Sequence, residues 1–260
     1  MAAADEDTGL PASLATAWGF KARPSKGPKP GLSLDRIVAA AVGVAAAEGI
    51  GAVSMGRVAK ELGVSPMSLY RYVGAKNELY ILMQEAVTPA PPGPLPDGAG
   101  WRAGLTRWAR AQRAFFHENL WLLRIPISGP PASPKSVAWM EYGLAALDGT
   151  GLDEGTKLGV IMLVSGYVRN EATLMSDLDA AYTASGHAPE EVLRHYQRTL
   201  ATLTDPERHP AVTRVLESDA LDQADEPDAD FEFGLGVVLD GVAALIARRD
   251  QGVPDRQSAP

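Results

Sequence analysis

The amino-acid sequence predicts an all-α fold in which a three-helix helix-turn-helix module precedes a larger helical bundle. Three observations lead to this prediction. Apolar residues recur at intervals of three and four along most of the chain, which is the period of a helix with one buried face. No segment alternates polar and apolar residues over the length of a strand. Prolines and glycines between Pro89 and Gly100 interrupt the helical pattern and separate the two parts.

The expected domain boundaries follow from these breaks. Residues 1–31 are rich in Ala, Pro, Gly and Lys without a helical period, so we expect a flexible basic tail. The helix-turn-helix module is expected at residues 32–83 and the bundle at residues 84–250. Residues 251–260 are expected to form a flexible C-terminus.

The module begins with two predicted helices. The first starts at Leu34 and ends before Gly49, which favours a helix C-terminus. Ser54 is a suitable N-cap for the second helix, which ends at Gly63. The apolar stripes of the two helices consist of Leu34, Ile37, Val38, Ala41 and Ala45, and of Met55, Val58, Ala59 and Leu62.

A tight turn and a third helix complete the pattern. Gly63 adopts a left-handed backbone at little cost, so it permits a sharp turn. Ser65 is the expected cap of the next helix, and Pro66 occupies the first helical position, where its missing N–H is harmless. Gly74 ends this helix, and a further helix runs from Lys76 to about residue 87. Two helices joined in this way form a helix-turn-helix, whose second helix can enter the major groove of DNA.

The residue types on the third helix suit DNA recognition. Met67, Ser68 and Arg71 share one face, and Arg71 can donate to a guanine edge or to a phosphate. Met67 can cover a thymine methyl group, and the hydroxyls of Tyr70 and Tyr72 can donate to phosphate oxygens. The alternative is an ordinary helical hairpin with aromatic core residues, which explains the caps and the turn but not the local charge.

The distribution of charge supports the DNA-binding interpretation. The net charge is −8, yet residues 21–76 carry nine Lys or Arg against three acids, a local charge of +6 that leaves −14 for the rest. A basic segment on an acidic body indicates that one end meets a polyanion. The basic stretch at residues 21–31 is either an arm that contacts DNA or a solvated leader, and the sequence favours neither.

The run of residues 34–83 resembles the N-terminal DNA-binding domain of the tetracycline-repressor (TetR) family of regulators. The matching features are the turn from Ala59 to Val64, the helix LYRYV and Lys76. The stretch FEFGLGVVLDGVAALIARR at residues 231–249 is similar to the last helix of the tetracycline-repressor type of C-terminal domain. The resemblance implies a homodimeric repressor that binds a palindromic operator and is released by a small hydrophobic effector.

The resemblance also implies roles for individual residues. Residues at the positions of Ser54, Tyr70, Tyr72 and Lys76 hold phosphates in such proteins, and those at Met67 and Ser68 face bases. This chain departs from some relatives in having Gly56 where they place a long donor that reads a base. Arg57, one residue on, is then the candidate to reach a phosphate. The expected DNA-binding residues are Ser54, Arg57, Ser65, Met67, Ser68, Tyr70, Arg71, Tyr72 and Lys76.

The larger part is expected to bind the effector and to form the dimer. Helices are predicted at residues 101–118, 134–148, 154–178, 189–204 and 231–249, with partial helices at 120–128 and 206–217. Aromatic residues on three of them could converge on one cavity, although an aromatic core is the simpler interpretation of any single one. Asn170 and Glu171 interrupt an apolar helix and are candidate polar contacts. The expected pocket residues are Trp108, Phe115, Trp139, Tyr142, Tyr167 and Asn170.

The dimer is expected to involve residues 154–178 and 231–249. The last helix carries many apolar residues interspersed with glycine, and small residues let helices approach closely. Packing inside its own domain is the competing explanation. The apolar residues concerned are Phe231, Leu235, Val238, Leu239, Val242 and Leu245.

Other classes of protein are not supported by the sequence. The chain has no cysteine, no apolar run long enough to span a bilayer and no hydrophobic leader, so we expect a cytoplasmic protein without membrane association. No nucleophile elbow, phosphate loop or paired-histidine motif is present, so neither a catalytic site, a metal nor a cofactor is expected. Two alternatives to the ligand-responsive regulator remain: a ligand-independent architectural DNA-binding protein, and an enzyme that uses the bundle pocket.

Overall fold

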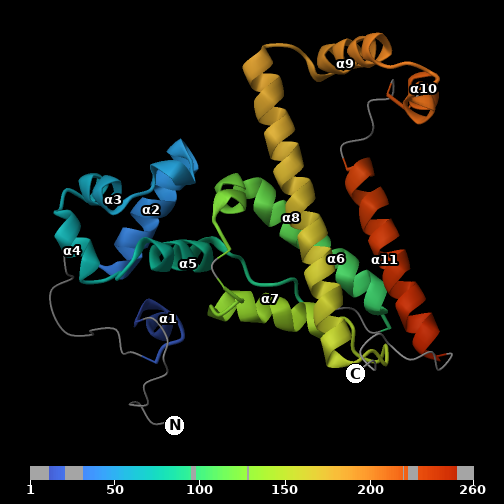
Figure 1. The fold of residues 1–260 in the computed structure, drawn as a ribbon. Helices are drawn as coiled ribbons and strands as arrows, with labels where there is room; N and C mark the ends of the chain where they lie inside the picture. Colours follow the sequence, from blue (N-terminus) through green and yellow to red (C-terminus); the bar gives the residue numbers. More distant parts are fainter. Residues whose placement is uncertain are drawn as a thin grey trace.

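The computed structural model describes residues 12–20, 32–94, 98–127, 129–218, 220–221 and 228–250, and all regular secondary structure in these residues is helical (Figure 1). The predicted all-α fold is therefore confirmed. The elements in chain order are α1 (Ala12–Ala17), α2 (Leu34–Glu48), the 3₁₀ helix η1 (Ile50–Ala52), α3 (Met55–Leu62), α4 (Pro66–Tyr70), α5 (Lys76–Val87), α6 (Trp101–Glu118), the 3₁₀ helix η2 (Leu120–Arg124), α7 (Pro134–Ala145), α8 (Glu154–Ser185), α9 (Pro189–Leu203), α10 (Pro210–Leu216) and α11 (Ala229–Asp250).

The N-terminal module consists of α2 to α5 around its own hydrophobic core. Buried residues of α2 and α3 meet Leu69, which is fully buried in α4, and Leu79 of α5. Burial of these apolar faces is what holds the short helices together, because helices of this length are marginal in isolation. We call this cluster the module core; its buried members are Ile37, Val38, Ala41, Val44, Ala45, Val53, Met55, Val58, Ala59, Leu69, Val73, Leu79, Tyr80, Leu82 and Met83, together with Trp121, Leu122 and Ile125.

The second part is a bundle of α6, α7, α8 and α11 (Figure 1). The long helix α8 packs against α6, α7 and α11, so it is the central element of the bundle. We call the shared cluster the bundle core; its buried members are Leu105, Trp108, Ala109, Trp139, Ala146, Leu147, Leu152, Val160, Ile161, Val164, Val168, Phe231, Leu235, Leu239 and Val242.

Helices α9 and α10 stand apart from both cores. In Figure 1 they extend from the end of α8 over the start of α11, and neither helix contains a buried residue. They pack against each other. Because α9 and α10 bury little apolar surface, they contribute little to the folding stability of the chain.

The segment expected to be a flexible tail contains a helix. Residues 12–17 form α1, which packs against α5, and its Leu14 and Ala15 are buried. The indole Nε1–H of Trp18 donates to the carbonyl of Ala132 at 2.8 Å. The prediction was wrong for these residues because tertiary contacts, rather than a long amphipathic period, stabilise so short a helix. The basic stretch at residues 21–31 and the C-terminus at 251–260 lie outside the described residues.

Two element lengths also differ from the predictions. Helix α8 continues to Ser185, its last residue. Gly186 follows with a φ of 69°, the left-handed conformation typical of the residue after a helix C-terminus. Helix α4 is short and ends at Tyr70. In the described part of the chain, no helix combines the length and apolarity that a bilayer crossing requires.

Candidate DNA-binding surface and bundle interior

Local capping and turn residues build the helix-turn-helix as the sequence predicts. The Ser54 hydroxyl accepts a hydrogen bond from the backbone N–H of Arg57 at 3.1 Å, which caps α3. Gly63 follows α3 with a φ of 68°, and Pro66 is the first residue of α4. Leu69 is fully buried, so it fixes the rotation of α4 about its axis and determines which of its residues face outward.

The outward face of α4 carries several of the residues expected to contact DNA, either bases or phosphates. Met67 is 74% exposed and Tyr70 is 50% exposed, although both are large apolar or aromatic side chains. Arg71, directly after α4, is also exposed, and its side chain makes no hydrogen bond or ion pair with the described residues. Exposed side chains held by a buried neighbour are positioned to contact a macromolecule, because their own fold does not use them.

The hydroxyl groups of Ser65 and Ser68 lie 3.0 Å apart and bond to each other. The expected cap by the Ser65 side chain is therefore absent: its backbone carbonyl accepts from the Ser68 N–H, but its hydroxyl caps nothing. Each hydroxyl retains the capacity for a further bond, because one O–H donates and the other oxygen accepts. The serine whose oxygen accepts this bond therefore keeps its own hydroxyl hydrogen free to donate to another group.

Tyr72 and Lys76 form contacts that bear on their expected phosphate roles. The Tyr72 hydroxyl donates to the carbonyl of Leu32 at 3.1 Å, so its single proton is already used. In this conformation Tyr72 supports the chain that leads into α2 and cannot donate to a phosphate. The Lys76 ammonium lies 5.3 Å from the centre of the Tyr80 ring and is exposed, so it remains available to an anion.

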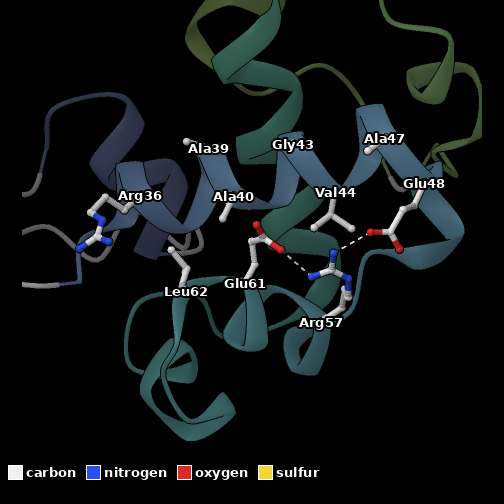
Figure 2. Close-up of a pocket in the computed structure, with 10 residues that line it drawn as sticks. All are labelled: Arg36, Ala39, Ala40, Gly43, Val44, Ala47, Glu48, Arg57, Glu61 and Leu62. Carbon is white, nitrogen blue, oxygen red and sulfur yellow. Dashed lines mark hydrogen bonds and ion pairs between the residues drawn. The ribbon is translucent and has the colours of Figure 1, made fainter.

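Arg57 is held by two carboxylates rather than presented to solvent. Its guanidinium pairs with Glu48 at 2.6 Å and with Glu61 at 2.7 Å, as Figure 2 shows. Hydrogen bonds to Glu48 and then to Glu61 raise the pKa of Arg57. This arrangement lines a hollow of about 490 Å³ between α2 and α3. The expected phosphate contact of Arg57 is not supported, because the guanidinium instead links α3 to the end of α2.

In the bundle, Trp108 and Trp139 are core residues with satisfied hydrogen bonds. The indole N–H of Trp108 donates to the carbonyl of Trp139 at 2.9 Å, and that of Trp139 donates to the carbonyl of Pro89 at 2.9 Å. Trp139 therefore links α7 to the segment that leaves α5. A Cβ at Gly143 would lie 2.9 Å from the Trp108 ring, so the close approach of α7 to this ring requires glycine.

Three of the other four predicted pocket residues, Phe115, Tyr167 and Asn170, do not join these tryptophans around one cavity. Phe115 packs against the module core, and the Tyr167 hydroxyl donates to the carbonyl of Phe231 at 2.9 Å beside the start of α11. Asn170 is exposed on α8, so in the single chain its side chain does not face the interior of the bundle. Its neighbour Glu171 is the buried member of the pair, since a step of one residue turns a helical side chain by about 100°.

Sequence inspection missed a charged network that crosses the bundle. Nε of Arg113 on α6 lies 3.1 Å from each carboxylate oxygen of Glu171 on α8, and Arg113 also pairs with Asp228 before α11. The Arg113 guanidinium carbon lies 4.5 Å from the centre of the Phe231 ring. Burial opposes the charge on Arg113, but its hydrogen bonds to Glu171 and Asp228 outweigh burial and raise the pKa. The partners are 58 and 115 residues distant along the chain, so no local pattern reveals them.

Two buried polar atoms lack a hydrogen-bond partner among the described residues: Nε2 of Gln112 and the hydroxyl of Tyr142. The Gln112 carbonyl oxygen accepts from the Ser165 hydroxyl at 3.2 Å, which places its amide between α6 and α8. Tyr142 lies on α7 and packs against the bundle core. A buried donor without a partner costs about 1–3 kcal/mol, so both groups mark places where a polar atom of a bound molecule would be favoured.

The fold and this surface define a class of protein: a helix-turn-helix DNA-binding regulator with a helical domain attached. Comparison with known families agrees. Residues 37–83 match the bacterial regulatory proteins of the tetR family, and residues 93–246 match the tetracyclin repressor-like C-terminal domain. The chain belongs to the TetR family of transcriptional regulators. Because that family is not enzymatic, the expectation of a non-catalytic regulator is confirmed by family membership.

Individual relatives are similar over most of their length. The chain is 38% identical over 240 residues to the HTH-type transcriptional repressor DrrR1 of Streptomyces coeruleorubidus, covering 91% of this chain and 87% of DrrR1. It is also similar in structure to ActR of Streptomyces coelicolor in complex with actinorhodin, with a TM-score of 0.69, 27% identity and coverage of 85% of this chain and 99% of ActR. For ActR in complex with (S)-DNPA, the TM-score is 0.65 at 28% identity, with coverage of 82% and 98%.

Proposed function

We propose that this protein is a cytoplasmic, homodimeric repressor that binds a palindromic operator and leaves it when a small hydrophobic effector binds the bundle. The observation that carries this proposal is the outward face of α4, where Met67 and Arg71 are exposed while Leu69 is buried in the module core. The repressor DrrR1 and ActR, which binds actinorhodin, support the repressing and ligand-binding parts by similarity.

The base-reading role of Arg71 can be tested directly. An operator is first selected with the wild-type protein from a random duplex library. Arg71→Ala should then weaken binding to this operator by about 1–3 kcal/mol and relax the preference at one base pair, because a bidentate guanine contact is lost. Arg36→Ala is the matched control, since Arg36 is also an exposed arginine of the module but lies on α2. Equal loss on operator and scrambled DNA for Arg71→Ala would contradict base reading.

The proposed dimer uses exposed faces of α8 and α11. The apolar residues first suggested for the α11 interface are partly internal, because Phe231, Leu235, Leu239 and Val242 are buried in the bundle core. The competing explanation of packing within the domain therefore holds for those four. The exposed large apolar residues of the two helices are instead Leu158, Met162, Leu163 and Leu174 of α8, and Phe233 and Val237 of α11.

These exposed residues form stripes that a second copy would cover. Phe233 is 76% exposed and Met162 is 74% exposed, and α8 and α11 lie side by side in the bundle (Figure 1). Two adjacent helices from each copy would give a four-helix contact with two-fold symmetry. Recognition helices in such a dimer would be about 34–36 Å apart, or a multiple, so that both meet the same side of DNA.

A charged residue at the interface tests this arrangement. Phe233→Asp should give a monomer in sedimentation experiments at micromolar concentration, since it places a charge in an apolar contact. Ile127→Asp is the control, because Ile127 is 80% exposed but precedes α7, outside the proposed interface. A wild-type monomer, or a dimer that survives Phe233→Asp, would contradict the arrangement.

The unpartnered atoms of Gln112 and Tyr142 indicate the chemistry of the effector. Both groups can donate a hydrogen bond, and the adjoining bundle core is apolar and aromatic. An aromatic molecule with carbonyl or hydroxyl oxygens would satisfy them, and actinorhodin is a suitable first probe. The proposed pocket therefore retains Trp108, Trp139 and Tyr142 from the predicted set and adds Gln112.

Release of the selected operator by a panel of aromatic compounds with carbonyl and hydroxyl oxygens, including actinorhodin, tests this assignment. For a compound that binds, Tyr142→Phe and Gln112→Leu should each weaken its affinity by about 0.5–1.5 kcal/mol, the net value of one hydrogen bond. Tyr196→Phe on α9 is the control, because Tyr196 is exposed. Unchanged affinity in both bundle variants would refute the assignment. A compound with equal affinity for free and operator-bound protein cannot act as the effector.

A further inference from the structure

The 3₁₀ helix η2 packs into the module core and also contacts α6 and α8 of the bundle. It begins directly after Asn119, which follows α6. Nevertheless, Trp121, Leu122 and Ile125 are buried in the cluster that holds α2, α3 and α5 together. The helix η2 also contacts η1 of the module. A displacement of η2 must therefore either move the module or disrupt its core.

Arg169 of α8 holds the backbone of η2 from the bundle side. Its Nη2 lies 2.9 Å from the carbonyl oxygen of Leu123, 3.2 Å from that of Ile125 and 3.3 Å from that of Leu122. Carbonyls at the end of a helix have no partner within the helix, and hydrogen bonds from a charged donor satisfy them strongly. The guanidinium also lies 5.8 Å from the centre of the Phe116 ring at the end of α6.

The charge of Arg169 has no carboxylate partner among the described residues, in contrast to Arg113 and Arg57. Burial lowers its pKa. An arginine that is half-buried against carbonyl oxygens is costly to place, because its desolvation is not offset by an ion pair. The position of Arg169 is therefore set by the carbonyls that follow Asn119 rather than by an ion pair, which is the geometry of a positioning residue.

Arg169 lies in a single turn of α8 that contacts three elements of the chain. Two residues before it, Tyr167 donates to the carbonyl of Phe231 in α11. Two residues after it, Glu171 pairs with Arg113 of α6. A rotation or shift of α8 against α6 or α11 would therefore displace this turn, and Arg169 would displace η2 with it.

We propose that Arg169 is the positioning residue that couples the state of the bundle to the DNA-binding module, by holding η2 in the module core. This inference rests on the proposed function of ligand-responsive operator binding. Arg169 connects the module to the bundle through η2, in addition to the covalent connection from α5 and the contacts between α5 and α7. Coupling between two sites is reciprocal. Operator binding to the module must therefore also change the conformation or mobility of α8, and this change can be measured without an effector.

Hydrogen–deuterium exchange of the full-length protein, with and without the selected operator, measures this coupling. In the wild-type protein, operator should slow exchange in α2 to α5 and also change it in the α8 segment around residues 164–176. In Arg169→Met the change in the module should remain and the change in α8 should be lost. Arg169→Gln should show the same loss, because its amide nitrogen is two bonds closer to the backbone than Nη2 of Arg169 and cannot reach the three carbonyls. If Arg169→Met fails to fold, the glutamine variant provides the test.

The matched control is Asp177→Asn. Asp177 of α8 pairs with Arg124 of η2, so it links the same two elements, but both side chains are about half exposed. Exposed ion pairs contribute little, so the α8 response should persist. A response that persists in a folded Arg169 variant, or one that is absent from the wild-type protein, overturns the proposal. Failure to select any operator overturns the proposed function instead, and the inference with it.

Discussion

Replacing Arg113 with methionine should strongly destabilise the protein, because it leaves a buried carboxylate without its cation. The Glu171 side chain is only 10% exposed, and Nη2 of Arg113 lies 3.0 Å from its Oε1. Breaking a buried ion pair from one side costs about 3–5 kcal/mol. For a domain of 150–250 residues, 1 kcal/mol lowers the melting temperature by about 2–4 °C, so we expect a decrease of about 6–20 °C. Methionine retains contact with the Phe231 ring, which isolates the loss of charge.

Thermal unfolding at one fixed protein concentration is the assay, because association shifts the apparent stability of a dimer. The double variant Arg113→Met/Glu171→Met should recover most of the loss, since removing both charges also removes the cost of burying them. Asp228→Asn should cost less than about 1 kcal/mol, because Asp228 is 68% exposed although it pairs with the same arginine. If Arg113→Met costs no more than Asp228→Asn, or if the double variant is as unstable as the single one, the assigned role of burial is wrong.

Three further predictions concern DNA affinity, packing and pH. Lys76→Ala should weaken binding to all DNA sequences alike and lower the slope of log K against log salt by about one, because one phosphate contact is lost. Gly234→Ala should lower the melting temperature relative to Gly236→Ala, since a Cβ at Gly234 would lie 2.3 Å from the Tyr167 hydroxyl whereas Gly236 has open space; equal melting temperatures would contradict this. Hydrogen bonds from the Thr156 side chain and then its backbone N–H lower the pKa of Asp153, so the stability that Asp153 adds is full above about pH 4 and is lost as the pH falls further. Asp153→Asn should reduce the dependence of unfolding free energy on pH between about pH 5 and pH 3, which chemical denaturation measures.

The helix-turn-helix is predictable from the sequence alone, because its signals act within a few residues. Ser54 caps α3 through a bond to a residue three positions on, and Gly63 permits the left-handed turn that follows. Pro66 starts α4 without loss of a hydrogen bond. The sequence also predicts that Met67, Ser68 and Arg71 share one face, and Met67 and Arg71 are exposed while Leu69 and Val73 are buried.

The positions of the bundle helices in the sequence were equally predictable, but the side of each helix that is buried was not. The period of α11 shows that it is apolar on more than one side, and only packing decides that Phe231 is internal and Phe233 exposed. The same holds for Asn170 and Glu171 on α8, of which the structure exposes the first and buries the second. When apolar residues surround a helix, periodicity does not specify its orientation.

Only the tertiary structure decided which polar groups are committed to other residues. Arg57 and Tyr72 have the residue types and positions expected for phosphate contacts, yet one is held by Glu48 and Glu61 and the other by the carbonyl of Leu32. Arg169 gave no signal in the sequence, since its partners lie 44–47 residues earlier in the chain. Capping and turn formation depend on neighbours in sequence, whereas a side chain's hydrogen-bond partners depend on how distant helices are brought together by burial of their apolar faces.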